Sequence, residues 1–119
     1  MGLFGNKKNK NKTSNSGVKN YLKIAVSKDG AEYTFALDGK LDTETSPELD
    51  SKISEVIGDA KMLIFDLAEL EYISSAGLRV LLGAAQAMED RGEMVVRNLT
   101  PTVSEVFDLT GFSRLFNLE

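Results

Sequence analysis

A short and almost uninterrupted apolar run at residues 62–67, Met-Leu-Ile-Phe-Asp-Leu, constrains the fold of this chain more than any other feature. Such a run is typical of a strand that is buried on both faces of a parallel sheet. A helical pattern of apolar residues follows between residues 74 and 92, and another strand-like run occupies residues 93–98. A strand, a helix and a second strand in this order form a βαβ unit, so the sequence predicts an α/β fold.

The N-terminal part of the domain is expected to add an antiparallel edge to this sheet. Residues 21–27 and 31–37 alternate apolar and polar side chains on either side of a turn signal, Lys28-Asp29-Gly30. The pattern predicts a β-hairpin, after which residues 38–42 lead the chain away. An acidic loop is expected at residues 69–71, between the buried strand and the central helix.

Two further helices are expected to cover the sheet. The first is capped by Thr45 or Ser46 and ends at Gly58, and another spans residues 100–111. Residues 115–118 are expected to add a final edge strand. The sequence therefore predicts a small mixed sheet of four to five strands with helices packed mainly on one side.

Residues 1–20 differ in composition from the rest of the chain. They contain five lysines and no acidic residue, whereas the other residues carry nine basic side chains against all eighteen acidic ones. The segment is rich in Asn, Ser and Gly, so we expect a flexible basic tail ahead of a single domain at residues 21–119. Leu3 and Phe4, ahead of the lysines, suggest a weak contact with an anionic membrane surface. The acidic domain disfavours nucleic acid as a direct partner.

The composition also disfavours most enzymes. The chain has no cysteine, which excludes disulfides and thiolate chemistry, and no histidine, which removes the commonest general base and transition-metal ligand. We therefore expect no catalytic residue, no metal site and no cofactor. The interpretation that fits best is a cytoplasmic binding or signalling protein.

The stretch Ser74-Ser75-Ala76-Gly77 stands where a loop enters the longest helical pattern. The unpaired N–H groups and partial positive charge of a helix N-terminus would stabilise a phosphoryl group on one of these serines. Such a group adds up to about two negative charges, at a surface that already carries Asp66, Glu69 and Glu71. Serine is also a favoured helix cap, so the pattern alone leaves capping as a sufficient explanation.

Asp38, Asp42 and Asp66 admit two interpretations. Magnesium binds through one or two carboxylates, so the three could belong to a metal or phosphoacceptor site. A receiver-like pocket, however, needs an acidic pair after the first strand and a late lysine, and here only Arg97 follows the fourth strand. The simpler interpretation is carboxylates at turns and strand ends, in contact with solvent.

The segment at residues 65–82, FDLAELEYISSAGLRVLL, resembles the signature of the STAS domain, and more narrowly that of bacterial anti-sigma factor antagonists. Residues 37–42, 92–96 and 106–111 are similar to further segments of the family in the same order, and the resemblance covers roughly residues 21–118. It implies the same fold, a small mixed sheet with helices on one side.

The resemblance implies a partner switch that regulates transcription. In this family an anti-sigma factor that is also a serine kinase binds the unphosphorylated antagonist, phosphorylates one serine and so ends the complex, and a PP2C-type phosphatase restores it. Alignment with the family motif makes Ser75 the phosphoacceptor and leaves Ser74, where members carry Asp or Ser, as the alternative. The implied partner-binding residues are Asp42, Ser74, Ser75, Ala76, Gly77 and Arg79.

Two other functions compete with this interpretation. The first is a STAS subunit of a membrane lipid-transport or transporter complex, which docks without a phosphorylation switch and gives the basic tail a purpose. The second is a small enzyme or nucleotide-binding protein that uses Asp42 and Asp66 with magnesium.

Overall fold

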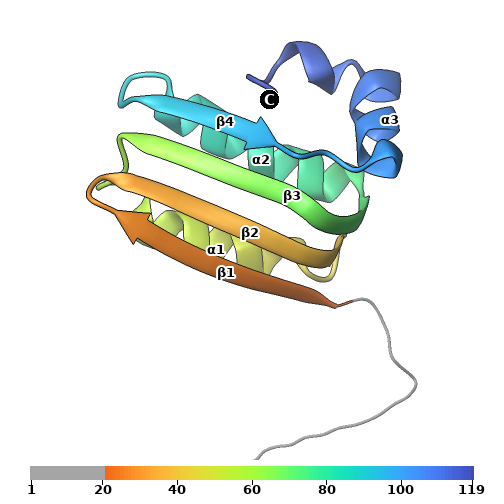
Figure 1. The fold of residues 1–119 in the computed structure, drawn as a ribbon, viewed down its shortest axis with the longest axis horizontal. Coiled ribbons are helices and arrows are strands. Elements are labelled where there is room, and N and C mark those ends of the chain that lie inside the picture. Colours follow the sequence, from red (N-terminus) through yellow and green to blue (C-terminus); the bar gives the residue numbers. More distant parts are fainter. Residues whose placement is uncertain (1–20) are drawn as a thin grey trace, which may run out of the picture.

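A four-stranded mixed sheet forms the centre of the computed structural model, which describes residues 21–119 (Figure 1). The elements in chain order are β1 (Leu22–Asp29), β2 (Glu32–Leu41), α1 (Ser46–Val56), β3 (Met62–Ile73), α2 (Ser75–Met88), β4 (Glu93–Arg97), α3 (Pro101–Thr110) and a short 3-10 helix, η1 (Phe112–Arg114). The expected basic tail at residues 1–20 lies outside the described residues. Within residues 21–119, no helix has the length and apolar character needed to cross a membrane.

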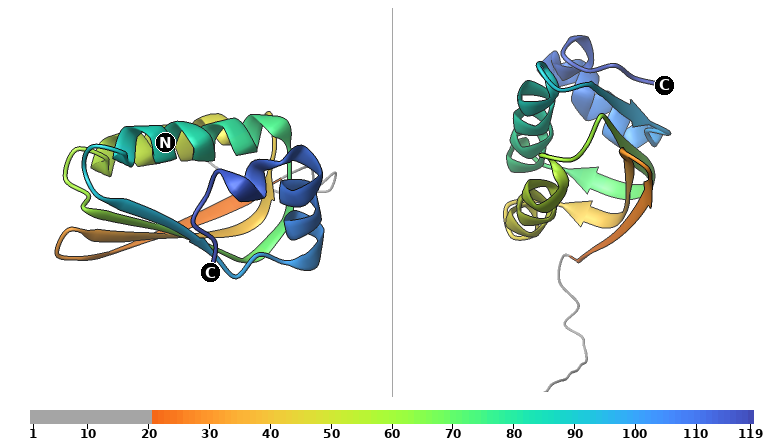
Figure 2. Two further views of the ribbon diagram at one scale, coloured as in Figure 1. Left: turned by 90° about the horizontal axis from the view of Figure 1, so that it is seen from above. Right: turned by 90° about the vertical axis from the view of Figure 1, so that its left-hand side faces the viewer.

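The strands lie in the order β1-β2-β3-β4. β1 and β2 form the predicted antiparallel hairpin, whereas β2 and β4 both run parallel to β3. The two parallel pairs are joined through α1 and α2, which lie on the same face of the sheet, and α3 packs at one end of the two layers (Figure 2). The predicted mixed sheet with an antiparallel edge and helices mainly on one side is confirmed.

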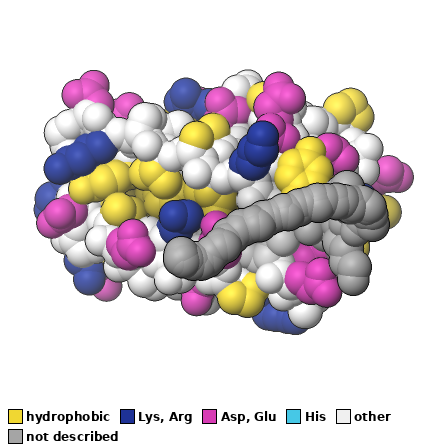
Figure 3. Space-filling view, turned by 90° about the horizontal axis from the view of Figure 1, so that it is seen from below, with side chains coloured by type: hydrophobic (Ala, Val, Ile, Leu, Met, Phe, Trp, Pro, Cys, Tyr) yellow, Lys and Arg dark blue, Asp and Glu magenta, His cyan; other side chains and the backbone are white. Residues whose placement is uncertain are grey.

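The core lies between the sheet and the helices α1 and α2. Alternate residues of β2 are buried, and the ring of Phe35 lies 5.4 Å from that of Phe65 in the neighbouring strand β3. The helices contribute one apolar stripe each, including Leu49 from α1 and Leu81 from α2, both fully buried. β1 borders the sheet, and apolar side chains are visible between charged ones on this side of the molecule (Figure 3).

Two segments that we expected to be loops are parts of strands. β2 continues through residues 38–41, and β3 continues through the acidic residues 69–71. Parallel pairing between the two strands extends to Leu41 and Ile73, with shifts of register along the way. In β3 the irregular pairing places two exposed residues in a row at 68–69 and at 71–72, which interrupts the alternation of apolar residues. In β2 burial alternates through to Leu41, but Asp38-Gly39 is a sequence typical of a turn.

The expected final strand at residues 115–118 is reduced to a single bridge. Leu118 pairs with Val96 in parallel, and the 3-10 helix η1 occupies the residues just before this segment. The backbone N–H of Val96 donates to the carbonyl of Asn117, and that of Glu119 donates to the carbonyl of Val96. The chain end therefore protects the outer edge of β4 without forming a regular strand.

Candidate functional site

A single residue, Ser74, separates β3 from α2, so the chain turns sharply from the sheet into the helix. We call residues 74–77 the serine turn. Ser74 has an extended backbone and caps α2, because its hydroxyl accepts a hydrogen bond from the N–H of Gly77 at 3.4 Å. Its own N–H donates to the carbonyl of Leu41 at 2.9 Å. The end of β2 and the start of α2 are thereby held together.

The two serines have different surroundings. Ser74 is half-buried and its hydroxyl serves as the cap, whereas Ser75 is exposed and is the first residue of α2. The helix has 14 residues, enough for an appreciable partial positive charge at its N-terminus. A group attached to the hydroxyl of Ser75 would therefore stand in solvent, close to the unpaired N–H groups of the first helical turn.

The other expected partner-binding residues of α2 differ in their exposure and packing. Arg79 is exposed one turn beyond Ser75, so the two side chains share a face of the helix. Gly77 is buried, and a methyl group at this position would lie only 2.7 Å from Cγ of Leu41. Gly77 thus allows α2 to begin directly against β2, while Ala76 is half-buried.

Asp42 lies beside the serine turn, because it follows Leu41 at the end of β2. Its side chain is 6 % exposed, and Oδ1 accepts hydrogen bonds from the backbone N–H groups of Glu44 and Thr45 at 2.9 and 3.0 Å. Among the described residues, Oδ2 has no hydrogen-bond partner although it is buried. One carboxylate oxygen of Asp42 therefore stabilises the loop before α1, and the other forms no hydrogen bond with the described residues.

Thr45 helps to form the site, but not in the capping role that the sequence predicts. It stands at the N-cap of α1, but its side chain makes no capping bond. Its hydroxyl instead donates to the carbonyl of Lys40 at 2.8 Å and accepts from the N–H of Asp42 at 2.9 Å. An Asp followed three residues later by Thr is the pattern of a side-chain-stabilised turn, and this signal could have revealed the loop.

The three carboxylates considered for a metal site are not brought together. Asp38 and Asp66 line the same hollow on the sheet face that carries no helix, whereas Asp42 is buried at the end of β2. Oδ1 of Asp66 accepts hydrogen bonds from the N–H of Ala68 and the amide of Asn98, both at 3.1 Å. Within residues 21–119 there is no group of three or more Asp or Glu side chains placed to hold a metal ion.

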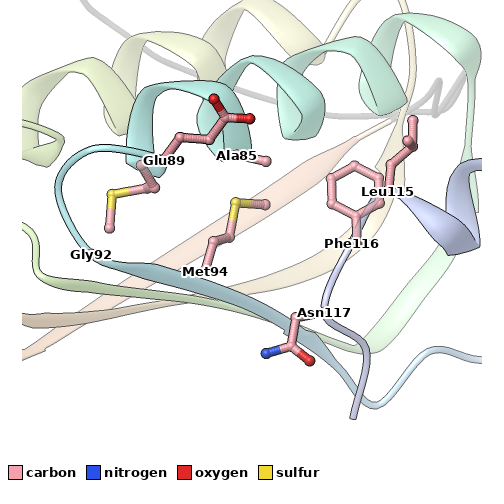
Figure 4. A pocket seen from close by; sticks show the side chains of 8 residues that line it. Ala85, Glu89, Gly92, Met94, Leu115, Phe116 and Asn117 are labelled. Atoms are coloured by element: carbon pink, nitrogen blue, oxygen red, sulfur yellow. The ribbon is translucent and has the colours of Figure 1, made fainter.

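A separate pocket lies between the end of α2, β4 and the C-terminal segment. Met88, Met94 and Phe116 are among the residues that line it (Figure 4). Since Met88 is the last residue of a 14-residue helix that Ser75 begins, the pocket lies about 20 Å from the serine turn at 1.5 Å of rise per residue. The pocket and the serine turn are therefore independent features.

Comparison with known proteins assigns the family. The model of the STAS domain matches residues 23–119. The chain belongs to the STAS domain family. Among its relatives is BtrV of Bordetella bronchiseptica, a candidate anti-sigma factor antagonist that is 35 % identical over 97 residues, covering 80 % of this chain and 84 % of BtrV. The anti-sigma-B factor antagonist of Listeria monocytogenes is 28 % identical over 83 residues, covering 68 % of this chain and 73 % of the relative.

Solved structures show the same STAS fold. An anti-sigma factor antagonist from Mycobacterium paratuberculosis superposes with a TM-score of 0.76 at 24 % identity, covering 82 % of this chain and 85 % of the other. The unphosphorylated form of SpoIIAA superposes with a TM-score of 0.72 at 24 % identity, covering 82 % and 88 %. The phosphorylated form of SpoIIAA from Bacillus gives 0.66 at 23 % identity, covering 82 % and 91 %. These likenesses confirm the predicted fold.

Proposed function

We propose that this STAS protein is an anti-sigma factor antagonist whose partner is an anti-sigma factor with serine kinase activity. The unphosphorylated antagonist binds that partner through the serine turn and the adjoining loop at Asp42, which releases the sigma factor. The kinase then transfers the γ-phosphoryl group of ATP to the hydroxyl oxygen of Ser75, whose proton is lost, and the complex ends. A PP2C-type phosphatase restores the antagonist by hydrolysing the phosphoserine to serine and inorganic phosphate. The protein itself catalyses nothing and acts in the cytoplasm.

The observation that carries this proposal is the difference in exposure and hydrogen bonding between the two serines. Ser74 is half-buried and engaged as the cap of α2, which leaves Ser75 as the exposed hydroxyl at the start of the same helix. A kinase needs access to the acceptor oxygen, and only Ser75 offers it without opening the cap. The names of the relatives, which include anti-sigma factor antagonists of several bacteria, support the class of partner.

The switch follows from charge and bulk at the docking surface. A phosphoryl group on Ser75 gains from the N-terminal partial charge of α2, so the helix accommodates it without refolding. The group also adds up to about two negative charges. The nearby surface already carries the exposed carboxylates of Glu69 and Glu71, and the buried Asp42 follows the end of β2 beside the serine turn. A partner that fits the neutral serine turn therefore binds the phosphorylated form less tightly, because the phosphoryl group adds bulk and negative charge at the contact.

The first test is to locate the phosphate on protein purified from its host. Trypsin releases residues 62–79 as one peptide that contains both serines, and fragmentation between them assigns the phosphoryl group. We expect phosphate on Ser75 and none on Ser74. Phosphate confined to Ser74 would overturn the assignment of the acceptor.

The second test compares variants as baits in a host lysate. Ser75→Ala should retain a serine-kinase anti-sigma factor, and Ser75→Asp should lose it by at least about tenfold, or ~1.4 kcal/mol. Ser51→Asp, which adds the same charge on the exposed side of α1, is the matched control and should behave as the unchanged protein. If membrane-transport subunits are captured equally by all variants, the STAS assignment stands and the proposed function fails.

A further inference from the structure

The sheet face opposite α1 and α2 contains a shallow hollow that the proposed function does not use. No helix of residues 21–119 covers this face (Figure 2). The hollow has a volume of about 440 Å³ and is lined largely by apolar atoms, including the small side chains of Ala25, Ala36 and Ala68. Ala25 and Ala36 are direct partners across β1 and β2, so the floor of the hollow is formed by side chains too short to fill it. We call it the alanine hollow.

Acidic side chains surround the alanine hollow. Asp38, Asp66 and Glu69 belong to its lining, and Lys23 is the one basic residue there. Glu71 continues the acidic rim into an adjoining depression that Asp38 and Glu69 also line. Among residues 21–119 the ion pair present is Arg97 with Glu119, at 3.3 Å, and it involves none of these four carboxylates. The rim therefore presents negative charge that no described basic side chain neutralises at contact distance.

The chain enters the described fold at this same rim. The carbonyl of Tyr21 accepts a hydrogen bond from the N–H of Lys40 at 2.7 Å, and its phenol donates to Glu71 at 3.2 Å. Gly39 has a φ of +120°, and a side chain there would meet the carbonyl and the ring of Tyr21. Tyr21 is thus fixed against β2 and β3, and residues 1–20 are attached directly beside the acidic rim.

Residues 1–20 have the complementary chemistry. They carry five lysines without an acidic residue, and Leu3 and Phe4 precede all five. Residues 4–12 lie 17 to nine positions before Tyr21, and an extended chain spans about 3.3–3.6 Å per residue, which gives a reach of roughly 30–60 Å. The fold is 42 Å long, so this reach covers the hollow. Attachment within one chain also gives an effective concentration on the order of millimolar, which makes a weak contact sufficient.

We propose that residues 1–20 dock on the open sheet face of their own chain. The lysines at positions 7–12 contact the carboxylates of Asp38, Asp66, Glu69 and Glu71, and Leu3 or Phe4 enters the alanine hollow. The docking does not depend on the proposed function.

Paramagnetic broadening in the full-length protein tests the docking. The chain has no cysteine, so Asn9→Cys provides a unique position for a nitroxide label among the lysines. We expect the label to broaden the amide signals of Ala25, Ala36 and Ala68 more strongly than those of α1 and α2. The broadening should disappear at about 1 M salt, where the Debye length falls to about 3 Å. Broadening that is uniform or stronger on the helices would overturn the proposal.

Charge variants separate docking from mere proximity. Asp38→Asn combined with Glu69→Gln should abolish the broadening on the open face. Asp50→Asn with Glu55→Gln makes the same change of charge on the exposed side of α1 and should leave it intact. Equal effects of the two double variants would contradict a specific contact.

Two further samples distinguish other occupants of the hollow. In a mixture of labelled protein with unlabelled, isotope-enriched protein, broadening of the enriched chains would show contact between copies and would overturn the intramolecular proposal. Capture of the protein by phosphatidylserine vesicles, without any broadening on the open face, would assign the basic segment to a membrane surface instead. None of these readouts involves the kinase, so they stand whether or not the proposed function fails.

Discussion

Gly77 packs directly against the side chain of Leu41. A methyl group on Gly77 would lie 2.7 Å from Cγ and 2.9 Å from Cδ2 of the leucine. Leu41 is fully buried at the end of β2, and its carbonyl also accepts the hydrogen bond from Ser74. The serine turn is therefore fixed twice against β2, once by packing and once through the backbone. An exposed hydroxyl on such a rigid support can be presented to a partner in one orientation.

The packing of Gly77 predicts that Gly77→Ala destabilises the fold. The new methyl group also meets Cγ1 of Ile73 at 3.0 Å, and overpacking a core costs about 1–3 kcal/mol. Gly83→Ala is the matched control in the same helix, since nothing lies within 4 Å of a methyl group there. That change should stabilise the protein by up to about 1 kcal/mol. Urea denaturation measures both, and equal stabilities for the two variants would contradict the close packing.

The different roles of the two serines predict different costs for their removal. Ser74→Ala deletes the cap of α2 and should lower the free energy of unfolding by about 0.5–2 kcal/mol. Ser75→Ala removes an exposed hydroxyl and should change stability by less than about 0.5 kcal/mol. Thr100→Ala should cost more than Ser74→Ala, because Thr100 caps α3 and also donates to the carbonyl of Leu70 at 3.0 Å. Thermal or urea unfolding gives the order, and an equal cost for both serines would argue against the assigned cap.

Much of the fold was predictable because its strands and helices follow simple periodicities. The hairpin around Gly30, the buried run that begins at Met62 and the helix that starts at the serine turn all appear where the pattern placed them. The extension of β3 was not predictable, since it places two exposed residues in a row at 68–69 and at 71–72. The extension of β2 keeps the alternation to Leu41, but Asp38-Gly39 is a sequence typical of a turn. Alternation of apolar residues is a property of one strand, whereas the length over which two strands pair depends on both of them.

The candidate site was predictable in part for a related reason. Serine before a helical pattern is a local signal, and it placed two serines at the start of the helix without deciding which of them is the cap. The sequence predicts that the hydroxyl of Thr45 caps α1. In the structure this hydroxyl instead forms hydrogen bonds with the carbonyl of Lys40 and the N–H of Asp42. The side chain serves the loop because β2 continues to Leu41 and brings these carbonyl and N–H groups within its reach. Whether Thr45 caps α1 or bonds to the loop therefore depends on the position of β2, which local sequence does not show.

The buried carboxylate of Asp42 predicts a large difference between two substitutions. Asp42→Ala leaves the N–H groups of Glu44 and Thr45 without their acceptor, and unsatisfied buried donors cost about 1–3 kcal/mol. Asp42→Asn keeps an acceptor oxygen in the same place and should retain most of the stability. Asp50→Ala, an exposed change on α1, is the control and should stay within about 0.5 kcal/mol. Equal denaturation midpoints for Asp42→Ala and the unchanged protein would refute the role of the carboxylate.

The contact between Tyr21 and Glu71 predicts a shifted titration of the phenol. The hydrogen bond to Glu71 and the negative charge of that residue raise the pKa of Tyr21 above its ordinary value of 10.0, with a smaller contribution from the charge of Asp38. Because the raised pKa favours the protonated phenol in the folded state, the contact stabilises the fold below about pH 10 and this contribution is lost as the pH rises through the folded pKa.

Substitutions at Glu71 should therefore lower the pKa of Tyr21 in a defined order. Glu71→Ala removes both the hydrogen bond and the charge and should give the larger decrease, whereas Glu71→Gln keeps an acceptor and removes only the charge. Glu69→Gln, a neighbouring carboxylate that does not contribute to the shift, is the control and should leave the titration unchanged. Ring signals of Tyr21 followed by NMR against pH report the value directly. If Glu69→Gln lowers the pKa as much as Glu71→Ala, the shift arises from the general negative charge of the rim and not from this contact.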